Sequence, residues 1–315
     1  MNAGRDWPCG SSGSCHAPPH WAFAKTKKEA EQAWDTELAK IEVETDEETK
    51  HIFYTALYHS CIAPNIFMDV DGAYRGTDLK THKAKDFQNY TVFSLWDTYR
   101  ATHPLFTLID QKRSNDFIKT FINQYEIGGQ LPVWELAGTY TGCMIGYHSV
   151  PVIVDAFVKG IRDYDVEKAY EAMLHSANQN HLGLASYKKN GFIAANDETE
   201  SVSKTLEYAY DDWCIAKMAK ELGKEADFKT FTERAQSYKN IFDPSTGFMR
   251  AKMNHSWFAP FNPSEVNFNY TEANAWQYSF YVPQDIQGFA NALGGKEQLE
   301  EKLDALFTSS SKTIG

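Results

Sequence analysis

The sequence predicts an all-α fold built from helical hairpins, and three observations support this prediction. Apolar residues recur at helical spacing over most of the chain, as at Ile52, Leu57 and Ile62. Most of these segments run into loops that hold Gly, Pro or Asn, the residues that end helices and form turns. Convincing alternation with period two is confined to short pieces such as residues 191–194, which disfavours a fold based on sheets.

About ten helices are expected, and local signals mark many of their ends. The first begins where a Gly-, Ser-, Pro- and Cys-rich start gives way to a charged segment, and Asp165 caps a later one. Gly128 and Gly129 close the fourth, and Gly223 closes the longest. The expected helices span residues 24–41, 46–63, 95–108, 115–127, 148–161, 166–174, 203–222, 227–242, 285–293 and 296–307. No tetratricopeptide or armadillo pattern recurs at a fixed period, so a closed α/α toroid is preferred over a solenoid.

Composition excludes several classes of partner. The net charge is 31 − 42 = −11, and no block of consecutive basic residues is present, so nucleic acid is not an expected partner. The longest apolar stretch, residues 150–158, is interrupted by Asp155 and is shorter than the roughly 20 residues that a bilayer requires, so no membrane span is expected. The first 24 residues hold no apolar run of the kind found in a signal peptide.

Loops rich in aromatic and acidic residues indicate where chemistry could occur. Trp96 precedes Asp97 and Trp134 precedes Glu135, a pairing suited to the apolar faces and hydroxyl groups of a sugar. Each pair is equally compatible with a core indole beside a helix-capping acid. No nucleophile elbow, Walker loop, zinc-protease motif or dinucleotide fingerprint occurs.

Two acidic residues of the longest expected helix, Glu207 and Asp211, lie four positions apart and therefore on one face. Like charges at this spacing destabilise a helix unless solvent or a partner compensates them. We expect this pair to be solvated or paired with a basic group. His148 and His103 are lone histidines, for which structural or substrate-contacting roles are favoured over metal ligation.

Four segments, in this order, carry a more specific signal. They read SLWDTYRATHPL (94–105), GGQLPVWELAG (128–138) followed by CMIGYHSVPV (143–152), SVSKTLEYAYDDW (201–213) and YTEANAWQYSFYVPQD (270–285). In sequence, order and spacing they resemble the signature segments of glycoside hydrolase family 92, the calcium-dependent exo-acting α-mannosidases. The resemblance extends from about residue 24 to the C-terminus.

The resemblance implies a fold and a domain organisation. Members of this family have an N-terminal β-sandwich followed by an (α/α)6 toroid, and this chain resembles the toroid only. We therefore expect residues 1–22 to be an irregular leader outside the family pattern. Residues 23–315 are expected to form the N-terminal portion of the (α/α)6 catalytic domain, an incomplete toroid of about ten helices truncated at its C-terminal end.

The resemblance also implies an activity and the residues for it. The family hydrolyses terminal α-linked mannose with inversion, on N-glycans or mannans, and its members are commonly secreted, periplasmic or at the cell surface. Glu272 matches the family's general acid, which must stay protonated in a partly desolvated setting that Trp276, Tyr270 and Phe268 could supply. The residues that match the mannose-binding positions are Asp97 and Arg100, with Trp134, Glu135 and His148 as further candidates.

Two functional parts of the family have no counterpart in this sequence. An inverting hydrolase needs a second carboxylate, roughly 6.5–9.5 Å from the first, to activate water. The family's motif for this base and its Asn-Glu-Pro-Ser calcium segment are both absent, so the Ca2+ implied by the family is expected to have its ligands beyond this chain's C-terminus. We expect an incomplete copy of the enzyme that does not cleave α-mannobiose by itself.

Two other functions remain open at this stage. One is a mannose-binding module without hydrolytic activity. The other is a different (α/α)6 carbohydrate-active enzyme such as a polysaccharide lyase, which would need a Tyr/His or Asn/His pair and a basic subsite. The acidic charge of the chain and the match at Glu272 disfavour the lyase.

Overall fold

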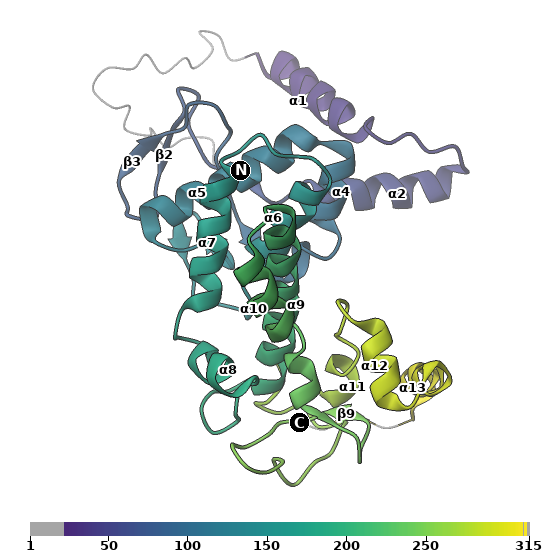
Figure 1. Cartoon of the computed structure of the whole chain (residues 1–315). Coiled ribbons are helices and arrows are strands. Elements are labelled where there is room, and N and C mark those ends of the chain that lie inside the picture. The colour runs from purple at the N-terminus through teal and green to yellow at the C-terminus, as the bar shows by residue number, and fades with distance from the viewer. Residues whose placement is uncertain (1–21, 311, 314–315) are drawn as a thin grey trace. The chain divides into compact units, whose positions relative to one another are not determined.

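The computed structural model describes residues 22–310 and 312–313, so the leader expected over residues 1–22 lies almost wholly outside the described residues. Within those ranges the chain forms thirteen α-helices, one 3-10 helix and nine strands of two or three residues (Figure 1). The helix-rich class predicted from the sequence is thereby confirmed. None of the described helices combines the length and apolar character that crossing a bilayer would demand.

The helices and strands have the following bounds. The helices are α1 (Phe23–Leu38), α2 (Glu47–Ser60), α3 (Leu95–Thr98), α4 (Thr102–Ile109), α5 (Gln111–Gly128), α6 (Ser149–Val158), α7 (Val166–Asn178), α8 (Leu184–Asn190), α9 (Ser201–Glu221), α10 (Glu225–Arg234), the 3-10 helix η1 (Ser237–Asn240), α11 (Ala275–Tyr278), α12 (Ile286–Leu293) and α13 (Lys296–Thr308). The strands are β1 (Asn65–Ile66), β2 (Ala73–Arg75), β3 (Thr81–Lys83), β4 (Tyr90–Thr91), β5 (Phe93–Ser94), β6 (Trp134–Leu136), β7 (Thr139–Tyr140), β8 (Phe242–Asp243) and β9 (Phe248–Met249). They pair antiparallel as β1–β4, β2–β3, β5–β6–β7 and β8–β9.

The chain divides into two compact units, of which the first ends at Cys61. This unit contains α1 and α2. Asp46 caps α2 by accepting a hydrogen bond from the backbone N–H of Thr49. The rings of Trp34 and Tyr58 join the two helices at a centroid distance of 4.7 Å.

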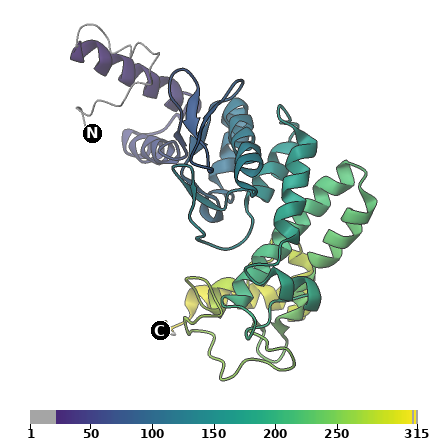
Figure 2. The ribbon, with the colours of Figure 1, turned by 90° about the vertical axis from the view of Figure 1, so that its left-hand side faces the viewer.

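The second unit, from Ile62 onward, is organised around α9. This helix of 21 residues packs against α6, α7, α10 and η1. Figure 2 shows α9 and its neighbours running alongside one another in the teal and green part of the chain. Because α9 contacts neighbours on several sides, most of its residues are buried, including charged ones.

The elements differ from the sequence-based prediction at several places. The helix expected over 95–108 is two helices, α3 and α4, because Pro104 has no N–H to continue the hydrogen-bond ladder back to Arg100. The helix expected over 227–242 ends at Arg234 and is followed by η1. Helices α8 and α11, with seven and four residues, are too short to show periodicity. Residues 191–194 form no strand, since Gly191 caps α8 in the left-handed conformation, at φ 73°.

An aromatic core joins α4 and α5 to β5. Phe93 and Phe121 are fully buried with their ring centroids 4.8 Å apart, and Phe117 packs edge-on against Phe93 at 5.7 Å. His103 lies against the same rings. These contacts fix β5, and therefore the start of α3, on the surface of α5.

This core makes a stability prediction. Phe121→Ala should lower the free energy of unfolding by about 3–5 kcal/mol, since it removes a fully buried ring and leaves a cavity. Phe268→Ala removes a ring that is 86% exposed and should change the same free energy by less than about 0.5 kcal/mol. Urea unfolding followed by circular dichroism measures both, and equal effects would show that the Phe121 cluster does not stabilise this unit.

Candidate functional site

One open cavity, with a volume of about 400 Å3, brings together segments far apart in the sequence. Its size is within the roughly 300–1,000 Å3 usual for small-molecule sites. One part of the lining comes from α3 and the turn after it, and the other from α11, the loop before it and the turn after it. The lining residues are Trp96, Asp97, Arg100, Thr271, Glu272, Ala273, Gln277, Tyr278 and Tyr281.

The carboxylate of Asp97 is exposed at this cavity and is oriented by its own helix. Asp97 lies in the first turn of α3, and the hydroxyl of Ser94, at the end of β5, donates to it. The guanidinium of Arg100 lies on the rings of Tyr99 and Tyr281, at 4.7 and 4.8 Å from their centroids. An exposed carboxylate and a stacked guanidinium on one wall can bind neighbouring hydroxyl groups of a sugar.

Glu272 reaches the cavity from a tightly held loop. The N–H of Thr271 donates to the buried hydroxyl of Ser203 at 2.9 Å, and Asn274 forms a capping box with Gln277 at the start of α11. Glu272 itself has a φ of 52°, which an L-residue rarely adopts outside a constrained site. The loop therefore presents this carboxyl group at a fixed place.

The apolar shelter expected around Glu272 is not formed by the described residues, and this corrects the expectation. The side chain of Glu272 is exposed. Phe268 is 86% exposed, the ring of Trp276 packs against Phe248 at 4.7 Å, and the hydroxyl of Tyr270 donates to the carbonyl of Met249. Trp276 and Tyr270 thus pack into the core next to the loop, and Phe268 faces solvent, so these rings do not shelter the carboxyl group.

Trp134 and Glu135 are adjacent in β6 and point to opposite faces of the small sheet. Trp134 is opposite Ser94, so it shares a face with the hydroxyl that holds Asp97. Glu135 is opposite the fully buried Phe93 and accepts hydrogen bonds from the Gly138 N–H at 2.6 Å and the Thr91 hydroxyl at 2.9 Å. Burial raises the pKa of Glu135. Neither residue lines the cavity, and Glu135 fixes the turn between β6 and β7.

A buried carboxylate, Glu207, stands behind the cavity wall. Its Oε1 accepts hydrogen bonds from the Trp96 indole Nε1 at 3.1 Å and the Tyr278 hydroxyl at 3.2 Å, and the Arg100 guanidinium lies 3.4 Å away. Its Oε2 is 3.1 Å from Nε2 of His148, an ion pair whose alignment is poor for a hydrogen bond. Glu207 is fully buried, so it touches the wall and not the cavity.

His148 lies between two acids and is also fully buried. Its Nδ1 is 2.8 Å from Oδ1 of Asp211, and its ring stacks on Tyr99 at 4.4 Å. Burial opposes the charged ring, but Asp211 and Glu207 outweigh it and raise the pKa of His148 to about 9. Burial also disfavours the charged form of Glu207, which raises its pKa. His148 and Arg100 outweigh this effect and hold the pKa of Glu207 below its usual value. Of the two expectations for the acidic pair on α9, pairing with a basic group is the one found.

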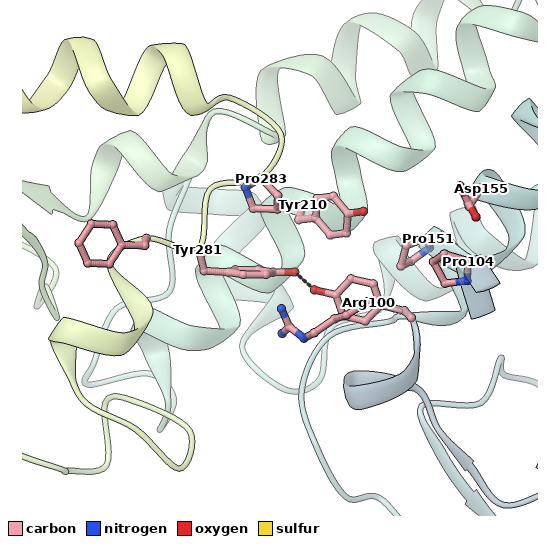
Figure 3. Close-up of a pocket in the computed structure, with 9 residues that line it drawn as sticks. Arg100, Pro104, Pro151, Asp155, Tyr210, Tyr281 and Pro283 are labelled. Atoms are coloured by element: carbon pink, nitrogen blue, oxygen red, sulfur yellow. Dashed lines mark hydrogen bonds between the residues drawn. The ribbon is translucent and has the colours of Figure 1, made fainter. Parts of the chain in front are cut away.

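A second cavity, of about 360 Å3, shares Arg100 and Tyr281 with the first as lining residues. Figure 3 shows Arg100 and Tyr281 side by side on its wall, and the hydroxyl of Tyr281 is hydrogen-bonded to that of Tyr99. Pro104, Pro151 and Asp155 group at the opposite end of this cavity. Arg100 and Tyr281 thus belong to the walls of both cavities, and the guanidinium of Arg100 also contacts the buried Glu207.

Of the six residues predicted for the site, the structure brings Asp97, Arg100 and Glu272 to one cavity. Trp134, Glu135 and His148 do not line it. Sequence reasoning paired Trp96 with Asp97 as a sugar-binding candidate, and both line the cavity. It missed Tyr278 on the wall and the place of Glu207 behind it. The four-residue spacing of Glu207 and Asp211 was the signal that could have found Glu207, since a buried like-charge pair requires a partner.

The calcium implied by the family resemblance has no visible set of ligands here. Within residues 22–310 and 312–313, no group of three or more His, Cys, Asp or Glu side chains could hold a metal ion. The described residues therefore do not fit a calcium site of that kind.

Comparison with known proteins places this site in a family. Residues 15–314 match the family described as "Glycosyl hydrolase family 92 catalytic domain". The chain belongs to glycosyl hydrolase family 92. The match begins eight residues before the boundary at residue 23 that the sequence analysis predicted, within a part of the chain that the structure does not describe.

Solved structures of family 92 resemble this chain closely. A family GH92 α-mannosidase from Bacteroides thetaiotaomicron superposes with a TM-score of 0.88 at 46% identity, covering 91% of this chain and 39% of its own. A structure of that mannosidase in complex with mannoimidazole also has a TM-score of 0.88, at 44% identity over 92% of this chain and 40% of its own. A family GH92 inverting mannosidase from the same organism gives 0.84 at 35% identity, over 90% of this chain and 40% of its own.

A curated relative from Arthroderma benhamiae, named a secreted glycosidase, is 27% identical over 341 residues. The alignment covers 94% of this chain and 40% of that protein. The chain thus spans about two fifths of the length of these relatives.

The charges around His148 predict a specific pH dependence. With its pKa raised from 6.5 to about 9, His148 contributes stability that is fully present below pH 6.5 and is lost as the pH rises through 9. The loss should be on the order of 3 kcal/mol in the free energy of unfolding. In an NMR titration the His148 ring should therefore stay protonated at neutral pH and titrate near pH 9.

His103 is the internal control for this titration. It is equally buried but faces phenylalanine rings, and burial lowers its pKa to about 3. Its ring should stay neutral from pH 9 down to pH 5. Titration of His148 below pH 7 would contradict the ion-pair assignment.

Proposed function

We propose that this protein is an α-mannosidase of family 92 that removes terminal α-linked mannose, with inversion, from N-glycans or mannans. The observation that carries the proposal is the single cavity lined by Asp97, Arg100 and Glu272 in a chain of this family. The mannosidase relatives and the mannoimidazole complex of one of them support the choice of mannose. The A. benhamiae relative supports a secreted enzyme.

The side chains of the cavity divide the work of binding. Asp97 accepts hydrogen bonds from sugar hydroxyls, while Arg100 donates to neighbouring oxygens from the same wall. The rings of Trp96, Tyr278 and Tyr281 offer apolar surface to the C–H face of the sugar. This combination of a carboxylate, a guanidinium and flat rings suits a hexose.

Glu272 is the proposed general acid. In its protonated form it donates a proton to the glycosidic oxygen as the bond to the anomeric carbon breaks, while water attacks from the opposite face of the sugar. Asp97 and Glu272 are the carboxylates among the described residues that line the cavity, and Asp97 is assigned to hydroxyl binding. The base for the water is therefore not assigned to a described residue.

We further propose that the helices of the second unit are part of an (α/α)6 toroid. The packing of consecutive helices around α9 and the superposition on family 92 structures support this architecture. Calcium remains a prediction of the family resemblance, and its test is whether a chelator removes activity.

A second candidate is binding of mannose without turnover. The exposure of Glu272 favours it, because its carboxyl group lacks the partly desolvated setting that a general acid needs. The two candidates share the same cavity and differ in whether the glycosidic bond is broken.

Binding tests what the two candidates share. The chain should bind mannoimidazole in calorimetry, and Asp97→Asn should weaken binding at least about tenfold, because the carboxylate's charge-assisted hydrogen bonds are lost. Asp163→Asn, which changes a carboxylate that is 84% exposed and paired with Lys119, should leave the affinity unchanged. Absence of binding by the unmodified chain would refute both candidates.

Hydrolysis of a mannoside distinguishes the enzyme from the binding protein, and a chimaera allows the rate of hydrolysis to be measured. In it, this chain replaces the matching region of the B. thetaiotaomicron α-mannosidase to which it is 46% identical. Glu272→Gln should lower the rate on α-mannobiose by about 10²- to 10⁴-fold and much less on a dinitrophenyl α-mannoside, whose leaving group needs little protonation. Glu265→Gln, in the same loop region but outside the cavity lining, is the control. Equal losses on both substrates would show that Glu272 is not the acid.

A further inference from the structure

Glu207 occupies an unusual position for a charged residue. It lies in the middle of α9, has no exposed surface, and is separated from the cavity by the side chains that it contacts. Its Oε1 is shared by three groups, the Trp96 indole at 3.1 Å, the Tyr278 hydroxyl at 3.2 Å and the Arg100 guanidinium at 3.4 Å.

All three groups belong to the cavity lining. Trp96 and Arg100 come from α3 and the turn after it, and Tyr278 is the last residue of α11. They lie 111, 107 and 71 positions from Glu207 in the sequence. One carboxylate oxygen therefore ties both walls of the cavity to the central helix.

The charge on Glu207 is stabilised from its other side. His148 faces Oε2 at 3.1 Å, and Asp211 holds the other ring nitrogen of His148 at 2.8 Å. The stacked Tyr99 covers this histidine, and Tyr99 is itself hydrogen-bonded to Tyr281 of the cavity wall. Hydrogen bonds to an ionised acceptor are shorter and stronger than those to a neutral one, so a charged Glu207 holds its donors more firmly.

We propose that Glu207 is a positioning residue of the mannoside site, which sets the orientation of Trp96, Arg100 and Tyr278 through one buried carboxylate oxygen. It does not touch the ligand. The identity of the ligand rests on the proposed function, whereas the positioning of the three side chains does not.

Asp212 provides a matched comparison five positions further along the same helix. It is also fully buried, and it accepts hydrogen bonds from two tyrosine hydroxyls and an arginine, those of Tyr147, Tyr187 and Arg234. None of these three lines the cavity. Removing a buried carboxylate should therefore lower the free energy of unfolding at both positions. A change in the orientation of the cavity side chains should appear only when Glu207 is replaced.

The test compares Glu207→Gln with Asp212→Asn in the whole chain. Three quantities are measured: the free energy of unfolding in urea, the affinity for mannoimidazole, and the indole 1H–15N signal of Trp96, assigned with Trp96→Phe. Glu207→Gln should shift the Trp96 signal without ligand and weaken mannoimidazole binding about tenfold or more, because a neutral amide is the weaker acceptor and leaves Arg100 without its countercharge. Asp212→Asn should lower stability to a similar extent but leave the signal and the affinity within about twofold of the unmodified chain.

Each outcome has a defined meaning. An unchanged Trp96 signal in Glu207→Gln, or equal losses of affinity in the two variants, would overturn the proposal. If the unmodified chain binds no mannoimidazole, the proposed function fails, and the ligand-free Trp96 signal still decides the positioning role.

A second pair of variants covers the case in which Glu207→Gln does not fold. Tyr278→Phe removes one donor to the Glu207 carboxylate, and Tyr187→Phe removes one donor to Asp212. The first should shift the Trp96 signal and the second should not. An unshifted signal in Tyr278→Phe would refute the shared-oxygen arrangement.

Discussion

The pairing of buried charges along α9 is the constraint on which the rest of this structure depends. The helix carries Lys204, Glu207, Asp211 and Asp212 into the interior, where an unpaired charge is strongly unfavourable. Each has a partner from another segment: Glu198 for Lys204, His148 for Glu207 and Asp211, and Arg234 for Asp212. These pairs determine which surfaces can pack on α9, because a segment without the right partner would leave a charge uncompensated.

The cavity wall depends on this helix because its own elements are too small to be stable alone. Helices α3 and α11 have four residues each, well below the length at which an isolated helix forms in water. Both are held from behind by Glu207, and the loop before α11 is held by Ser203 of the same helix. A rigid central element thus supports short, irregular segments that present the polar groups, which is a common way to combine stability with a binding surface.

The same arrangement explains why the carboxylates behind the cavity wall and those that line the cavity have such different surroundings. Glu207, Asp211 and His148 are sealed from solvent and have fixed charges, whereas Asp97 and Glu272 are exposed at the open cavity. The buried group contributes geometry, and the exposed group is available to a ligand. Fixing the geometry of the wall and contacting a ligand therefore fall to different carboxylates.

The sequence by itself determined the long helices, the family and three residues of the cavity. Periodicity and capping residues are local signals, so they located α5, α7, α9, α12 and α13 to within a few residues. They could not reveal α8 or α11, because each is shorter than two helical periods. They also missed the break before Pro104, because the helical pattern there looks continuous. The motifs named Asp97, Arg100 and Glu272, but gave no information about which faces of the loops meet.

The tertiary structure alone decided which side chains share a space. Spacing showed that Glu207 and Asp211 lie on one helix face, yet their partner His148 is 59 positions upstream of Glu207 and 63 upstream of Asp211. Alternation along β6 places Trp134 and Glu135 on opposite faces of the sheet. Only the pairing with β5 determines that Glu135 faces the core and Trp134 lies on the face of Ser94. The physical reason is that helix and strand periodicity depends on residues that are neighbours in the sequence. Burial and charge pairing depend on contacts between segments that are distant in the chain.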